Sequence, residues 1–265
     1  MKSNNYPIGI FDSGVGGTSI WKEIKTLLPQ EDTIYLSDSK NAPYGTKNKK
    51  EIINLSIKNT EFLLKQNCKL IVVACNTATT NAIKTLREKY EIPFIGIEPA
   101  IKPAALQTKT FKIGVLATKG TLNSELFEKT SSLINQKISR KEIVGKGLVE
   151  LIENGKLHST EMTELLNSYL KPLLKENIDA LVLGCTHYPY LIPQIREIVG
   201  DKIKIIDSGE AVARQTKAIL ERQALLNNQN TKSTHTFYIN KNKGVLQQLI
   251  HVDKSSALKI VEKDF

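Results

Sequence analysis

Short apolar segments alternate with amphipathic helical segments along most of this chain. The apolar segments are rich in valine and isoleucine and cover residues 6–11, 33–37, 69–74, 92–97, 111–116, 179–184 and 203–206. Between them, residues 50–67 and 160–177 repeat apolar positions at helical spacing. Strands that alternate with helices form parallel sheets covered by helices. The sequence therefore predicts an α/β fold, in which an active site lies at the carboxyl ends of the strands.

Two of these expected strands end on a cysteine in nearly the same context. The segment "VVACNTAT" contains Cys75, and "VLGCTHYP" contains Cys185, 110 positions later. In both places polar residues and the start of a helix follow the cysteine. A helix N-terminus stabilises a thiolate, and a free thiol titrates near pH ~8.5. A buried thiol that only packs would explain one such site, but not the repeated polar residues after it.

Further pairs of segments keep the same order along the chain. Residues 92–97 correspond to 202–207 at the same offset as the cysteines, and residues 8–18 correspond to 113–121. We therefore predict two related α/β domains with mainly parallel sheets. The expected domains are residues 1–97 plus 207–265, which hold Asp12 and Cys75, and residues 98–206, which hold Cys185 and His187. Residues 233–239 and 257–262 are expected to add edge strands to the first domain.

Composition limits the class of protein. The chain has 265 residues, of which 40% are hydrophobic, enough for a sizeable core. It lacks an apolar stretch long enough to span a membrane and a secretory signal, so we expect a cytoplasmic protein. Three cysteines in a chain of this length argue against a disulfide framework. The net charge of +10 leaves nucleic-acid binding as an alternative, but the lysines are scattered, and attraction of an anionic substrate is the milder explanation.

The segment "FDSGVGGTSIWKEI" (11–24) combines a strand end, a glycine-rich turn and a helix start. Such a turn favours a bound anion. It matches the dinucleotide fingerprint at Gly14 and Gly16 but has Ser19 in the third position, with Asp38 after the next strand. A nicotinamide-dependent enzyme is therefore kept as an alternative. Asp12 suits an ammonium group or a thiol that must be oriented, and its simplest alternative role is a helix cap.

Metal binding is the competing explanation for the cysteines. Cys75, Cys185 and His187 supply three ligands, but the sequence has no CxxC motif, and the remaining histidines, His158, His235 and His251, lie in other segments. Cys68 lies at a helix–strand junction and is expected to pack in the core. Glu150 is an acid in an apolar surrounding, and a simple charge on a helix face would explain it equally well.

Five segments in order resemble one family of enzymes. "GIFDSGVGG", "DSKNAPYG", "VVACNTATT", "LVE" and "LVLGCTHYP" together resemble the glutamate racemases of the aspartate/glutamate racemase superfamily, over residues 8 to about 215. The resemblance implies two pseudo-symmetric α/β domains that face each other across a cleft, no cofactor and no metal. It also implies conversion of L-glutamate to D-glutamate, which supplies peptidoglycan synthesis. An aspartate racemase or another amino-acid racemase of the same superfamily is the alternative.

The resemblance also implies roles for individual residues. Cys75 and Cys185 would be the two acid/base groups, because inverting a carbon requires proton removal on one face and delivery on the other. Asp12 and His187 would assist them, one in each half, with Glu150 a second helper beside Cys185. The implied substrate-binding residues are Asp12, Ser13, Tyr44, Gly45, Asn76, Thr77, Thr118, Thr121, Thr186 and His187. The role of Asp38 is left open, because the wording of its segment differs from the family's. The expected partners are the small-molecule substrate and a second copy in a homodimer, without membrane or nucleic acid.

Overall fold

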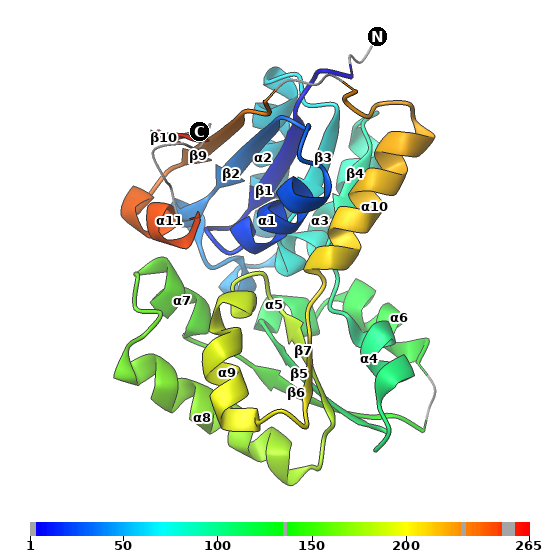
Figure 1. The fold of residues 1–265 in the computed structure, drawn as a ribbon, viewed down its shortest axis with the longest axis vertical. Helices are drawn as coiled ribbons and strands as arrows, with labels where there is room; N and C mark the ends of the chain where they lie inside the picture. Colours follow the sequence, from blue (N-terminus) through cyan, green and yellow to red (C-terminus); the bar gives the residue numbers. More distant parts are fainter. Residues whose placement is uncertain (1–3, 135–136, 229–231, 251–257) are drawn as a thin grey trace.

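Two parallel β-sheets organise the molecule (Figure 1). The computed structural model describes residues 4–134, 137–228, 232–250 and 258–265. Every strand pairing in both sheets is parallel. The predicted fold class, α/β with mainly parallel sheets, is thereby confirmed.

The larger sheet has six strands in the order β10-β9-β2-β1-β3-β4. Its strands are β1 (Ile8–Asp12), β2 (Thr33–Ser37), β3 (Leu70–Val73), β4 (Phe94–Gly96), β9 (His235–Ile239) and β10 (Leu258–Glu262). Its helices are α1 (Thr18–Leu27), α2 (Lys49–Lys65), α3 (Asn76–Lys89), α10 (Gly209–Arg222) and α11 (Lys243–Ile250). We call this sheet and its helices the large lobe. Strands β1 and β3 are buried at every residue, as expected for central strands covered on both faces.

The smaller sheet has four strands in the order β6-β5-β7-β8. Its strands are β5 (Lys112–Ala117), β6 (Ser139–Val144), β7 (Ala180–Gly184) and β8 (Lys204–Ile206). Its helices are α4 (Ile101–Gln107), α5 (Lys119–Leu122), α6 (Glu125–Ser132), α7 (Leu148–Glu153), α8 (Thr160–Lys175) and α9 (Ile192–Val199). We call this sheet and its helices the small lobe. Short 3₁₀ turns cover Ser39–Asn41, Tyr44–Thr46 and Tyr188–Leu191.

The seven strands expected before residue 207 all occur, within two residues of their expected bounds. Strand β6 was not expected, because its sequence "SRKEIV" is mostly charged or polar. It lies at the edge of the sheet, where charged side chains are common. The tail strand β9 is not an edge strand, as the sequence suggested, but lies between β2 and β10. Strand β10 is at the edge; residue 257, which began its expected range, lies outside the described residues.

The chain passes between the lobes twice, from β4 to β5 and back from β8 to α10. The Ser208 hydroxyl donates a hydrogen bond of 2.5 Å to the Glu98 carbonyl and so joins the two crossings. The predicted domain boundaries at 97/98 and 206/207 fall close to them and stay a prediction. Among the described helices, none combines the length and the apolar character needed to cross a membrane.

Candidate active site

Both predicted cysteines line one small buried cavity between the lobes. Cys75 follows β3 of the large lobe, and Cys185 follows β7 of the small lobe. The cavity is lined by Ser13, Pro43, Tyr44, Gly45, Cys75, Asn76, Thr77, Thr118, Val149, Cys185, Thr186 and His187. Its volume is about 10 Å³, room for about one water molecule. An amino acid can therefore enter only if the lobes or the loops around the cavity move.

Cys75 is linked to a carboxylate through a hydroxyl. Its thiol caps α3, where Sγ accepts the Ala78 N–H at 3.4 Å, and it donates to Ser13 Oγ at 3.6 Å. Ser13 Oγ in turn donates to Asp12 Oδ1 at 3.3 Å. Burial raises the pKa of the Cys75 thiol well above its usual value, and the negative charge of Asp12 adds to this. Cys75 therefore holds its proton at neutral pH.

Cys185 is linked to a carboxylate through an imidazole. Its Sγ lies 3.7 Å from His187 Nδ1, and His187 Nε2 lies 2.6 Å from Glu153 Oε1. Burial lowers the pKa of His187, but its hydrogen bonds to Cys185 and Glu153 outweigh burial and raise this pKa well above the usual value. An imidazolium therefore faces the Cys185 thiol.

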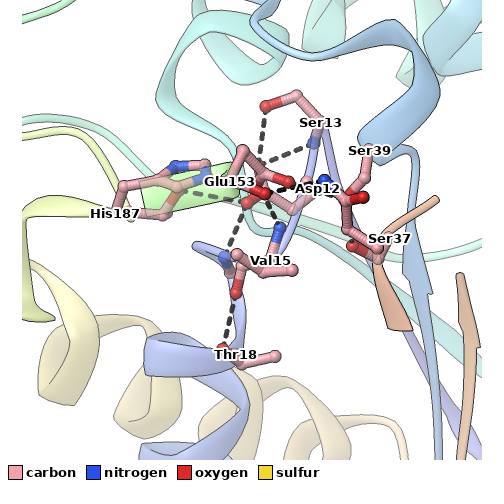
Figure 2. Close-up of polar contacts among 12 residues, drawn as sticks. Asp12, Ser13, Val15, Thr18, Ser37, Ser39, Glu153 and His187 are labelled. Carbon is pink, nitrogen blue, oxygen red and sulfur yellow. Dashed lines mark hydrogen bonds and ion pairs between the residues drawn. The ribbon is translucent and has the colours of Figure 1, made fainter. Parts of the chain in front are cut away.

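The two thiols thus have matching surroundings, each joined through one polar group to a buried carboxylate. Both carboxylates also bridge the lobes. Asp12 Oδ2 accepts the Gly17 N–H at 2.6 Å and the Thr186 hydroxyl at 3.3 Å. Glu153, on α7 of the small lobe, reaches into the large lobe, where it accepts the Val15 N–H at 2.6 Å and the Ser39 hydroxyl at 2.7 Å (Figure 2). The carboxylates therefore fix the two halves of the site against each other.

The acid that contacts His187 is Glu153, whereas the sequence analysis selected Glu150. Glu150 is half-buried and lines an outer pocket of about 290 Å³ together with Lys119 and Lys146. Glu150 and Glu153 are three residues apart on one short helix, so their side chains are neighbours, but Glu153 enters the buried cluster and Glu150 stays at the outer pocket. Helical spacing indicates Glu153, because it is four residues from Val149 and shares a helix face with it, and Val149 lines the cavity.

The glycine-rich turn makes room for side chains from the other lobe. A Cβ atom at Gly14 would overlap the Glu153 carboxylate, and one at Gly16 would overlap the His187 ring. Ser19, in the third position of the incomplete fingerprint, donates to the Thr186 carbonyl at 2.9 Å. The residues that suggested a dinucleotide site therefore pack against protein.

Three of the four predicted threonines form one cluster across the lobes. Thr77 Oγ1 lies 2.8 Å from Thr118 Oγ1 and 3.3 Å from Thr121 Oγ1, and Thr118 and Thr121 are 3.0 Å apart. Beside them, both side-chain amide atoms of Asn76 are buried and lack a hydrogen-bond partner within the described part of the chain. Buried polar groups without partners are rare. Asn76 is therefore suited to holding a polar ligand in the cavity.

Asp38, whose role the sequence left open, supports the loop that carries Tyr44. The Tyr44 hydroxyl donates to Asp38 Oδ2 at 2.6 Å, and Asn59 donates to the same hydroxyl at 3.1 Å. Asp38 is fully buried and also accepts a hydrogen bond from Asn240 at 2.6 Å. Gly45, next in the loop, lies so close to Thr118 that a Cβ atom there would be 2.8 Å from the Thr118 Cβ.

Cys68, His158 and His235 lie away from the cavity. In the described ranges, no three His, Cys, Asp or Glu side chains gather as a metal site would require. His235 Nδ1 lies 2.9 Å from Thr33 Oγ1, and His158 is near Gln194; His251 is outside the described residues. Cys68 is packed in the core of the large lobe, and burial raises its pKa to about 12.

Comparison with known proteins identifies the family to which this chain belongs. An α/β fold with paired thiols in one cavity is the arrangement of an isomerase that moves protons. Residues 8–216 match the family model Asp/Glu/Hydantoin racemase, and the chain belongs to this family. It is 48% identical over 208 residues to a glutamate racemase of Ralstonia pickettii, covering 78% of this chain and 74% of that one.

Solved structures of glutamate racemases are similar to this chain in fold. The glutamate racemase isoform RacE1 of Bacillus anthracis is 32% identical, with a TM-score of 0.87 and 98% of each chain covered. The glutamate racemase of Francisella tularensis, solved in complex with D-glutamate, is 31% identical, with a TM-score of 0.83 and the same coverage.

Proposed function

We propose that this chain interconverts L- and D-glutamate without a cofactor, through a two-base mechanism in which Cys75 and Cys185 are the acid and the base. One observation carries the proposal: a thiol from each lobe lines the same cavity. The similarity to glutamate racemases over most of the chain supports glutamate as the substrate. A racemase of aspartate or another amino acid is the alternative.

In the proposed reaction the α-carbon of glutamate lies between the two thiols. The thiolate on one face takes the α-proton, and the electron pair left on carbon takes a proton from the thiol on the other face. The raised pKa of Cys75 suits the thiol that donates the proton, and Cys185, beside the His187 imidazolium, is the acid/base group on the other face. After each turnover the protonation states of the two cysteines are exchanged. This form acts on the other enantiomer, and proton exchange with water returns the enzyme to the first form.

Polar groups around the cavity serve to hold the substrate. We assign the amide of Asn76 and the hydroxyls of Ser13, Thr77 and Thr118 to the substrate carboxylates and ammonium, with Tyr44, Gly45, Thr121 and Thr186 completing the wall. Asp12 and Glu153 assist Cys75 and Cys185 through Ser13 and His187. Exclusion of water strengthens each of these interactions as charge develops on the α-carbon.

The proposed product is D-glutamate for peptidoglycan synthesis, made in the cytoplasm by a homodimer. The test is an assay of purified protein with each enantiomer of glutamate and of aspartate, with optical rotation as the readout and no cofactor added. We expect glutamate to be turned over far better, because a shorter side chain would leave buried polar groups unpaired. Equal kcat/KM for aspartate would reject the substrate assignment, and dependence on an added cofactor would reject the mechanism.

A further inference from the structure

Two asparagines that follow strand β9 contact the buried acids of the site. Asn240 donates to Asp38 Oδ1 at 2.6 Å, and Asn242 donates to the main-chain carbonyl of Glu153 at 2.8 Å. We call residues 240–242 the tail loop. It lies beyond residues 8–216, the part of the chain that matches the family model. The tail loop is thus a contribution of the C-terminal segment to the surroundings of the site.

Asn242 completes the hydrogen bonding at the end of helix α7. The last carbonyls of a helix have no partner within it. Here the carbonyls of Glu150, Leu151 and Ile152 accept the N–H groups of Asn154, Lys156 and Gly155. The next carbonyl, that of Glu153, accepts the side-chain amide of Asn242. The residue that presents its carboxylate to His187 is therefore held at its backbone by the tail loop.

The surroundings of Asn242 keep this contact in place. Its backbone adopts the left-handed conformation, with φ of 62°, which asparagine and glycine tolerate better than most residues. Helix α11 begins at the next residue and lies over α7 (Figure 1). Val245 of α11 lies beside the turn at Gly155, since a Cβ atom added to Gly155 would be 3.5 Å from it. Tail loop and α7 are thus packed together across the lobes.

We propose that Asn242 is a positioning residue for one of the two thiols: it fixes Glu153, Glu153 fixes His187, and His187 serves Cys185. The proposal rests on the two-base function given above. Cys75 is served by Ser13 and Asp12, neither of which contacts Asn242 in the described structure. The loss of the Asn242 amide therefore weakens proton transfer at Cys185 more than at Cys75.

Single-cysteine enzymes separate the two halves of the reaction. In Cys75→Ser only Cys185 remains as the thiol base, and in Cys185→Ser only Cys75 remains. The probe is each enantiomer of 3-chloroglutamate: the base takes the α-proton, the Cα–H electron pair forms a Cα=Cβ bond, and chloride leaves with the Cβ–Cl pair. Asn242→Gly removes the amide and keeps the left-handed backbone. We expect it to slow chloride release about tenfold in the Cys75→Ser enzyme and less than about twofold in the Cys185→Ser enzyme.

Two further variants control for folding. Asn177 is an exposed asparagine with φ of 59° on the small lobe, before the start of β7 and so at the opposite end of that strand from Cys185, and Asn177→Gly should leave both rates unchanged. Asn242→Asp keeps the backbone preference without the donor and should repeat the selective loss, with a melting temperature recorded for each protein. Equal loss in both single-cysteine enzymes, or no loss in either, would overturn the role of Asn242 alone. Elimination from the same enantiomer by both single-cysteine enzymes would overturn the two-base function, and the inference with it.

Discussion

At the scale of single residues, the two thiols share one cavity, and each is joined to a carboxylate, Cys75 through a hydroxyl and Cys185 through an imidazole. Each should act on one face of the substrate. We expect Cys75→Ser and Cys185→Ser each to nearly abolish racemisation, because a hydroxyl is a far weaker acid and base than a thiol at neutral pH. In deuterated water the wild-type product should gain deuterium at the α-carbon, while recovered substrate gains little early in the reaction. Early label in both enantiomers, measured by mass spectrometry, would indicate a single base.

Glu153 and Glu150 offer a direct comparison on the same helix. Glu153→Gln removes the charge that helps to raise the pKa of His187, so this pKa should fall. Activity that needs the imidazolium is lost as pH rises through that pKa; the alkaline limb of the kcat/KM profile should therefore move to lower pH. We expect a loss of about 10²-fold or more at neutral pH. Glu150→Gln, at the outer pocket, should cost much less, and the reverse order would restore the assignment made from the sequence.

Cys68 is a buried thiol outside the proposed mechanism, and it should make stability depend on pH. Its pKa is about 12 in the folded protein and ~8.5 in an unfolded chain. The folded state therefore keeps the proton longer. Its stabilising contribution is full below pH ~8.5 and falls by about 1.4 kcal/mol per pH unit above that value. Urea unfolding of wild type and Cys68→Ser between pH 8 and 10 tests this: the slope should be smaller in the variant, and equal slopes would contradict the shift.

At the scale of elements, the glycine-rich turn before α1 is shaped by α7 and by the turn after β7. Gly14→Ala and Gly16→Ala should each displace Glu153 or His187, because the added methyl group overlaps them. We expect overpacking to cost about 1–3 kcal/mol of stability and activity to be largely lost. Gly244→Ala is the matched control, since a Cβ atom there meets nothing within 4 Å. Gly244→Ala should preserve activity and stabilise α11 by up to about 1 kcal/mol. Normal activity in Gly14→Ala would contradict the prediction and show that the turn can shift to accommodate a methyl group.

At the scale of the whole molecule, the cavity between the lobes is too small for the proposed substrate to enter. The lobes are joined by two crossings of the chain, tied at Ser208 and Glu98, which suits a hinge. We expect the ligand-free protein in solution to be more open than this arrangement and to close when glutamate binds. Small-angle X-ray scattering should show a smaller radius of gyration with glutamate than without it. An unchanged radius would place substrate entry in loop movements instead.

Much of this arrangement could be predicted from the sequence. The strands that lead to Asp12, Cys75 and Cys185 are short, apolar and bounded by polar residues. The local sequence pattern was therefore enough to predict their positions. The repeated cysteine context predicted two related halves, and the family resemblance assigned roles to the cysteines. Strand β6 was not predicted, because this edge strand is mostly charged or polar and lacks the apolar alternation that indicates a strand.

What the sequence by itself determined is the order of the strands and the residues at their ends, because strand pattern and turn chemistry are local properties. Only the tertiary structure decided which acid serves His187, what the glycines of the turn accommodate, and that the tail loop holds α7. These depend on contacts between residues far apart in the chain: Glu153 meets Val15 across 138 positions, and Asn242 meets Glu153 across 89. The direction of a side chain on a short helix is fixed by its packing partners, and those partners lie in the other lobe.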